Sequence, residues 1–274
     1  MEEKARETQR DRMSVAIQVW MVALDNYPGW KDWRRAKFTR TLHFDDLSPV
    51  IAEKLKAVDE FKFAPEIENQ HAVVLQYLGL EQAIYLLKEC EFYFRRYPFR
   101  GLPVTRYSHL TNVCEMYFGR FYEFKERLKK YFEAMKKVAP AHGLNIGAFI
   151  KRYEKVFADE LRERNGIHHH SRFEDLALDR IFLTETISTM RKGDWEQEHI
   201  AEYRKLANEW VQRVRSRGAK LEEFLEAVAE ATLASCAFLS DSSVSSGQAA
   251  TNGHAEHVSA FRGLGGALTA TDAE

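Results

Sequence analysis

The sequence is short of cysteine, proline and glycine, and each shortage excludes a class of fold. The 274 residues include 3 Cys, 6 Pro and 14 Gly. A β-sandwich or barrel turns about every 8–12 residues and would need more Pro and Gly. The cysteines, Cys90, Cys114 and Cys236, lie far apart and form no CxxC pair, and their odd number argues against a disulfide framework. We therefore expect reduced thiols in a helix-rich protein.

Net charge and long apolar segments are also lacking. The 40 basic and 41 acidic side chains give a formal net charge of -1. This balance excludes a histone-like basic binder and an acidic disordered chain, so any nucleic-acid contact needs a local basic patch. The longest apolar-rich run, residues 15–24, is too short for a membrane span of ~20 residues, and the charged N-terminus does not resemble a secretory signal. We expect a cytoplasmic protein that does not enter a membrane.

What the sequence does contain is helical periodicity, and the clearest case lies between Ser108 and Val138. Ser108 is the expected N-cap of a long helix, and Pro140 follows its end. A second stripe over residues 146–161, with Asn145 as the expected N-cap, follows a short link, which predicts an antiparallel pair of helices. The first stripe recurs at alternating spacings of 4 and 3 residues and consists of Leu110, Cys114, Tyr117, Phe121, Phe124, Leu128, Tyr131, Met135 and Val138.

Further helices are predicted on both sides of this pair. One covers residues 173–190, and another begins near Trp195 and is interrupted at Gly218 before a last stretch at 221–239. Residues 12–24, 50–58 and 66–94 form the N-terminal helices, the last of them kinked near Gly79. No six-residue window alternates with period two, so few or no strands are expected. The Ser- and Gly-rich residues 240–274 cannot bury enough apolar area and are expected to be a disordered tail.

The densest polar cluster follows the second helix of the pair, at residues 160–171. The apolar stripe ends at Leu161, and the next positions on the same helix face are Arg164 and His168. Asn165 and His169 likewise lie one turn apart. A guanidinium, an amide and imidazoles therefore converge at one helix end. Imidazole exchanges protons near neutral pH, and guanidinium binds phosphate through paired hydrogen bonds, so these side chains suit phosphodiester chemistry.

This cluster resembles the Arg-Asn-x-x-x-His motif of HEPN domains. His170 also fits the looser Arg-x4–6-His form of that family. The resemblance covers about residues 106–239 and implies an all-α, HEPN-like bundle, with residues 1–105 as a helical N-terminal extension. The matching residues are Arg164, Asn165, Gly166, Ile167, His168 and His169.

The resemblance implies a metal-independent endoribonuclease whose cleft forms between two protomers. His169 would act as general acid and base for the RNA 2′-hydroxyl, and Arg164 would hold the scissile phosphate. Asn165 would orient the histidine or the phosphate. His168 and His170 are additional candidates. The expected partners are RNA, a second copy of the chain and a cognate antitoxin protein, and no cofactor or metal is expected. In one group of HEPN relatives, a Tyr two residues after the motif His is modified. This sequence has Ser171 at that position, so this modification is not expected.

Other interpretations of the cluster stay open. Three consecutive His suggest a metal site, but successive helical residues point about 100° apart, and neither HExxH nor a nearby Cys accompanies them. Arg and His at a helix C-terminus also complement the helix dipole, with Gly166 as a C-cap, in which case the cluster is structural. The whole chain would then be a non-catalytic helical adaptor or a protein of toxin–antitoxin type that binds other proteins.

A second basic feature lies at residues 92–107. It holds four Arg and six aromatic residues within sixteen positions. Aromatic faces stack on bases while Arg contacts phosphates, which would suit a path for single-stranded RNA. Alternatively, Phe92, Phe94 and Phe99 are core residues and the arginines are solvated. The arginines are Arg95, Arg96, Arg100 and Arg106. The Trp-containing residues 30–38 form a weaker version, in which Trp favours packing.

Overall fold

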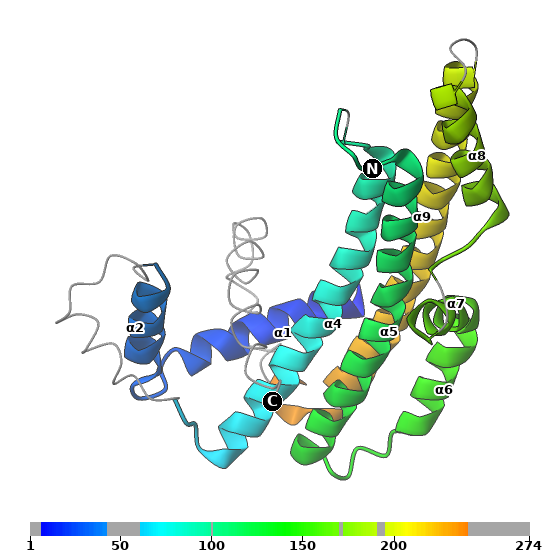
Figure 1. The fold of residues 1–274 in the computed structure, drawn as a ribbon. Helices are drawn as coiled ribbons and strands as arrows, with labels where there is room; N and C mark the ends of the chain where they lie inside the picture. Colours follow the sequence, from blue (N-terminus) through cyan, green and yellow to red (C-terminus); the bar gives the residue numbers. More distant parts are fainter. Residues whose placement is uncertain (1–6, 43–60, 100, 170–171, 191–194, 241–274) are drawn as a thin grey trace, which may run out of the picture. The chain divides into compact units, whose positions relative to one another are not determined.

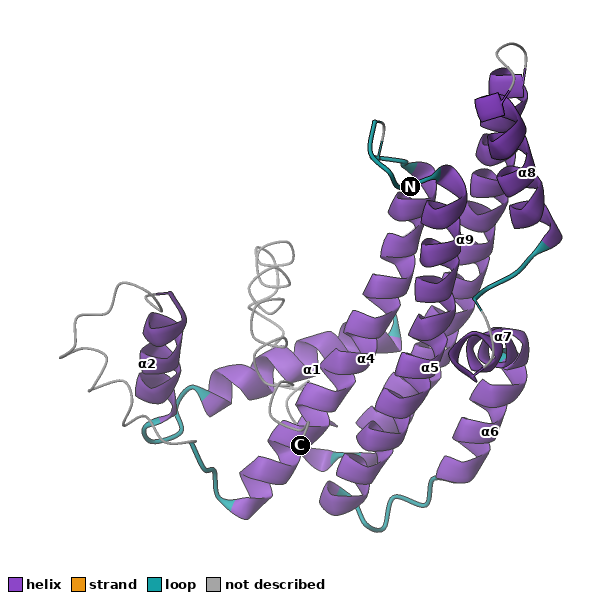
Figure 2. Cartoon of the chain, in the orientation of Figure 1, coloured by secondary structure: helices purple, strands orange, loops and turns teal. Residues whose placement is uncertain are grey.

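The computed structural model describes residues 7–42, 61–99, 101–169, 172–190 and 195–240. Every regular element in these ranges is an α-helix (Figure 1), and no strand occurs in them (Figure 2), which confirms the predicted all-α class. None of these helices is long and apolar enough to span a bilayer. The helices are α1 (Gln9–Leu24), α2 (Trp30–Leu42), α4 (Pro65–Arg95), α5 (Arg106–Val138), α6 (Ile146–Val156), α7 (Ala158–His169), α8 (Leu176–Met190), α9 (Trp195–Ser235) and α10 (Ala237–Ser240).

The chain divides into two compact units. The first comprises residues 1–75, 134–142 and 228–274, and the second comprises residues 76–133 and 143–227. The boundary at residue 106 stays a prediction from the sequence. The predicted helix at 50–58 lies outside the described residues. The predicted tail at 240–274 lies outside them too, except for Ser240, which ends helix α10.

In the first unit, aromatic side chains join the N-terminal helices. Helix α1 begins with a capping box, in which Thr8 and Asp11 exchange side-chain and backbone hydrogen bonds of 3.0 and 3.1 Å. The Trp20 indole donates to Gln70 Oε1 at 3.0 Å and meets Phe238 of α10 edge-on. A ring cluster follows at the start of α2 and contains Tyr27, Trp30, Trp33, Phe61, Phe63 and His71. Buried Trp30 is therefore a packing anchor, as its segment predicted.

Most of helix α5, up to Glu133, lies in the second unit, and its last residues belong to the first. The predicted stripe is buried along its whole length from Leu110 to Met135, and Val138 at its end is half-buried. The helix begins at Arg106, two residues before the predicted N-cap, because Thr105 Oγ1 accepts a hydrogen bond from the Ser108 N–H at 3.1 Å. Thr105, not Ser108, therefore caps α5.

Helix α6 runs antiparallel to α5, as the short link predicted. Three ring contacts pair the two helices in reversed order: Phe149 with Phe132, Tyr153 with Phe124, and the following Phe157 with Phe121. Asn145 caps α6 by accepting from the Ala148 N–H at 3.0 Å, which confirms the predicted N-cap.

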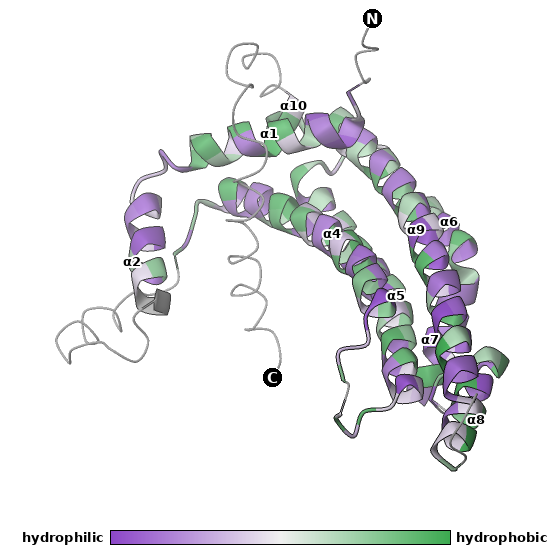
Figure 3. Cartoon of the chain, turned by 90° about the horizontal axis from the view of Figure 1, so that it is seen from above, coloured by the Kyte–Doolittle hydropathy of each residue, from purple (hydrophilic) through white to green (hydrophobic). Residues whose placement is uncertain are grey.

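The predicted interruptions at two glycines are wrong, because α4 and α9 pass through Gly79 and Gly218 without a break. A Cβ at Gly79 would lie 2.8 Å from Nη1 of Arg127 on α5, and one at Gly218 would lie 3.4 Å from the Lys88 side chain on α4. Each glycine lies where a neighbouring helix places a long side chain against the backbone. Gly therefore marks close approach here, although it lowers helix propensity by ~1 kcal/mol. In Figure 3, hydrophobic and hydrophilic residues alternate along α9, as expected for a helix with one packed face.

Candidate functional site

The predicted site lies on α7, which is a separate helix from α6. Helix α6 ends at Phe157, whose backbone angles of φ -113° and ψ 28° are not helical. The Val156 carbonyl, which a continuous helix would pair internally, instead accepts a hydrogen bond from Arg217 of α9 at 2.9 Å. The prediction of one helix through this segment is wrong because buried Phe157 and this bond to α9 stabilise the break.

A buried ionic cluster attaches α7 to α9. The Glu160 side chain is 2% exposed and forms ion pairs with Arg217 and, at 3.6 Å, with Arg213. Arg213 also lies 4.8 Å from the Trp210 ring centroid, and Arg217 lies 5.1 Å from that of Phe157. Charged side chains are rarely buried, but these are tolerated in the interior because the Glu160 carboxylate and the two guanidinium groups pair with one another. This cluster determines which face of α7 is turned inward.

Sequence reasoning placed Glu160 in the polar cluster but assigned it no role. The signal was its register, because position 160 lies three residues after Phe157 and one before Leu161, on the buried side of the stripe. An acidic residue at such a position indicates a buried cationic partner elsewhere in the chain. The sequence does not show which arginine supplies that partner.

Arg164 occupies the next turn of the same face and is half-buried. Its Cζ lies 3.7 Å from the ring centroid of Tyr122 on α5, a cation–π contact, and its Nη1 donates to Asn165 Oδ1 at 3.4 Å. Lys125 lies near the same ring, with Nζ 5.2 Å from its centroid. The structure therefore brings together Arg164, Asn165 and a second cation on α5. Tyr122 was not identified from the sequence because it lies off the α5 stripe.

The two described histidines lie at the end of α7. The side chains of His168 and His169 are exposed, and their ring centroids are 5.0 Å apart. Helix α7 continues past Gly166 with helical geometry, so this glycine is not the C-cap that the structural interpretation required. His170 and Ser171 lie outside the described residues. Among the described residues, no group of three His, Cys, Asp or Glu side chains is arranged to hold a metal ion.

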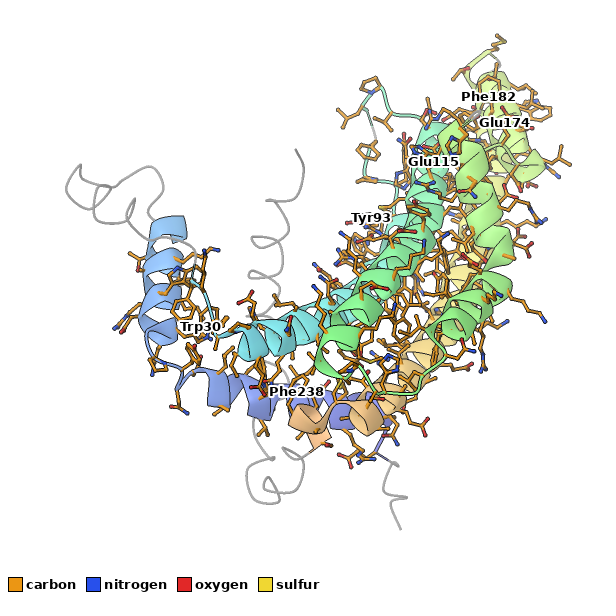
Figure 4. The ribbon with its side chains drawn as sticks, turned by 90° about the horizontal axis from the view of Figure 1, so that it is seen from below. Trp30, Tyr93, Glu115, Glu174, Phe182 and Phe238 are labelled. Carbon is orange, nitrogen blue, oxygen red and sulfur yellow. The ribbon has the colours of Figure 1, made fainter. Side chains whose placement is uncertain are left out.

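The segment after the motif is tied to α5. Arg172 donates to Glu115 at 3.2 Å and to Asn112 at 2.5 Å, and the Phe173 N–H donates to Glu115 at 3.3 Å. Figure 4 labels Glu115 on α5. Because α7 is held at its start by Glu160 and just past its end by these bonds, the exposed imidazoles lie on a helix fixed at both ends.

The arginines of residues 92–107 do not join the motif. Arg95 pairs with Glu91 at 2.6 Å, and Arg96 lies 5.1 Å from the Phe92 ring. Arg106 begins α5, sixteen residues before Tyr122, which is roughly 24 Å along the helix at 1.5 Å per residue. Arg100 lies outside the described residues. The core interpretation holds for Phe94, which is buried, but Phe92 is 55% exposed.

Comparisons with known proteins do not extend this picture. No family model, curated protein or solved structure matches the chain. The HEPN-like interpretation therefore stays a prediction from the motif at Arg164–His169.

Proposed function

We propose that the chain is a HEPN-type, metal-independent endoribonuclease that acts as a homodimer. The observation that carries the proposal is the end of α7, where Arg164, hydrogen-bonded to Asn165, is followed one turn later by exposed His168 and His169. A guanidinium, an amide and an imidazole on one fixed helix end are the groups that cleavage by a 2′-hydroxyl uses. Such cleavage needs no metal and leaves a cyclic phosphate.

Each side chain has a distinct role in this proposal. His169 takes the proton from the 2′-hydroxyl and returns a proton to the leaving oxygen. Arg164 binds the scissile phosphate and stabilises the charge that develops on it, while Asn165 orients the guanidinium. No residue of α7 lines either of two cavities that the described residues form beside Arg106. A second copy of α7 across a twofold axis would supply the missing wall of the cleft.

The test is cleavage of mixed RNA by the purified full-length chain in EDTA. His169→Ala should abolish cleavage without lowering the melting temperature, since the side chain is exposed. Arg164→Ala should lose cleavage and weaken RNA binding. Arg162→Ala is the matched control, because Arg162 is 71% exposed and pairs with the exposed Asp159. His168→Ala should keep most activity.

Several results would contradict the proposal. If His170→Ala inactivates the chain and His169→Ala does not, the acid–base role assigned to His169 is wrong and the looser spacing to His170 applies. Cleavage that survives all three His substitutions, or that requires a divalent metal, excludes this mechanism. A monomer at tens of micromolar in sedimentation would remove the second copy of α7 on which the composite cleft depends.

A second candidate is a non-catalytic interaction protein of the adaptor or toxin–antitoxin type. It is favoured by the apolar outer face of α8, where Leu176, Leu183 and Met190 are 88%, 57% and 79% exposed at seven-residue spacing. Phe182, labelled in Figure 4, adds a fourth exposed apolar side chain. Monomers rarely expose such patches without a partner. A chain that cleaves no RNA, and whose association is lost in Leu183→Glu, would support this candidate.

A further inference from the structure

Two cavities lie where α5 and α9 begin, and no role has been assigned to them. The larger, of about 440 Å³, is lined by Tyr97, Phe99, Gly101, Leu102, Arg106, Glu196 and Ile200. The smaller, of about 270 Å³, is lined by Arg106, Glu185, Ser188, Thr189, Glu196 and His199. Arg106 and Glu196 line both cavities, so the two are neighbouring parts of one site. Their sizes fall near the ~300–1,000 Å³ of small-ligand sites.

Aromatic and aliphatic walls form one side of this site. Tyr97, Phe99 and Ile200 line the larger cavity and are only partly exposed, and Gly101 turns the loop with a φ of 76°. The Arg106 guanidinium lies over the Tyr97 and Tyr203 rings, 5.1 and 5.9 Å from their centroids. Its face is therefore held against rings, while its N–H edge stays available for an acceptor.

The smaller cavity contains a buried polar atom without a hydrogen-bond partner. His199 is 1% exposed, its Nδ1 lies 3.0 Å from Thr184 Oγ1, and its Nε2 has no hydrogen-bond partner among the described residues. The nearest carboxylate oxygen, from Glu185, is 3.8 Å away and caps the α5 N-terminus by accepting from the Arg106 N–H at 3.1 Å. Burial lowers the pKa of His199, so at neutral pH the ring offers a hydrogen bond without charge. A buried polar atom of this kind favours a ligand that satisfies it.

Two opposite charges line the site without pairing to each other. Within the described residues, no ion pair or side-chain hydrogen bond engages the Arg106 guanidinium or the Glu196 carboxylate. A ligand that matches both must present acceptors on one edge and donors on another, together with a flat apolar face for the aromatic wall. Simple anions match only Arg106, and simple cations match only Glu196.

We propose that this site binds a guanine base of single-stranded RNA. Guanine presents the O6 and N7 acceptors that arginine binds in pairs, and its N1–H and N2–H donors match the two oxygens of a carboxylate. Its ring fits beside Tyr97 and Phe99. The smaller cavity, with the hydroxyls of Ser188 and Thr189 and the free Nε2 of His199, takes the ribose and its 2′-hydroxyl. The RNA source of the base rests on the proposed function, whereas binding of the base does not require cleavage.

The first test is calorimetric titration of the full-length chain with GMP, AMP, CMP and UMP. GMP should bind about tenfold or more tightly than the others, because each bidentate contact discriminates by ~1–3 kcal/mol. Glu196→Gln and Arg106→Lys should each lower GMP affinity by about tenfold for the same reason. The matched controls are Glu209→Gln and Arg204→Lys, which lie at exposed positions on α9 and line neither cavity. Absent binding of GMP, equal binding of all four nucleotides, or equal losses in the controls would overturn the proposal.

The second test separates an RNA strand from a free nucleotide. A fluorescent oligouridine with one guanine should bind more tightly than the same oligouridine without it, and Glu196→Gln should remove the difference. If GMP binds but the two strands bind alike, the occupant is a free nucleotide and the proposal of an RNA base is wrong. His169→Ala should lose cleavage and keep GMP binding, so failure at α7 and failure at this site are distinguishable.

Discussion

Replacing Glu160 by alanine should lower the free energy of unfolding by several kcal/mol. The carboxylate is 2% exposed and pairs with two arginines of α9, and Arg217 itself is only 18% exposed. Glu160→Ala therefore leaves the largely buried Arg217 guanidinium without its carboxylate partner. Arg217 still contacts the Val156 carbonyl and the Phe157 ring. The buried Tyr117 hydroxyl, whose pKa is raised mainly by burial and next by Glu160, lies in the same cluster.

The magnitude follows from the burial. Removing one partner of a buried ion pair costs about 3–5 kcal/mol, because the other charge stays desolvated. At the lower end of that range, the melting temperature should fall by roughly 6–12 °C. Asp159→Ala is the matched control, since Asp159 is the adjacent residue and pairs with Arg162 at 2.7 Å with both side chains about 70% exposed. An exposed pair contributes only ~0–1 kcal/mol.

The assay is urea unfolding, followed by the circular dichroism of the helices. It is applied to the single variants Glu160→Ala, Asp159→Ala and Arg217→Met, and to the double variant Glu160→Ala/Arg217→Met. The double variant should be more stable than the sum of the two single losses predicts, because it removes both charges together. Equal, small losses for Glu160→Ala and Asp159→Ala would refute the reasoning. So would strictly additive losses in the double variant, since the two residues would then not interact.

Three further predictions concern a glycine, a histidine and the thiols. Gly119→Ala should raise stability by about 0.5–1 kcal/mol, seen as a higher urea midpoint, because Gly119 lies inside α5 and a Cβ there meets no atom within 4 Å. The melting temperature should fall as the pH is lowered below about 6.5, because burial lowers the pKa of His199 in the folded chain. The unfolded chain then binds a proton that the folded chain does not, which favours unfolding. The variant His199→Asn should show a smaller fall. No thiol should react with a disulfide reagent at pH about 8 until denaturant is added, because thiolates are the reactive form. Burial raises the pKa of all three cysteines, to about 12 for Cys90 and to about 11 for Cys236, and well above the usual value for Cys114.

Most of the helices follow from local sequence. The α5 stripe, the Asn145 cap and the turn before α6 were predicted correctly because helix formation depends on spacings of three and four residues and on short-range caps. The interruptions predicted at Gly79 and Gly218 were wrong for the same reason, since local propensity ignores what a neighbouring helix places against the backbone.

The candidate site was predicted only in part. The register of α7 correctly placed Arg164 on the face that continues from Leu161, and it placed His169 near the helix end. The partners of this face come from segments far apart in the sequence, and no spacing rule identifies Tyr122 of α5 for Arg164. For the same reason, the arginines of residues 92–107 were grouped together by sequence, whereas Arg95 and Arg106 have different partners in the structure.

The sequence by itself determined that the chain is helical, which residues of α5 are buried, and that a guanidinium and imidazoles share one helix end. These properties could be predicted because they follow from the spacing of apolar and polar residue types along a single helix. Only the tertiary structure decided where α6 ends, because Arg217, sixty-one positions away, takes the Val156 carbonyl. It likewise decided that Glu160 is buried and that His199 lines a cavity with Arg106, since burial and pairing depend on which helices pack together in three dimensions.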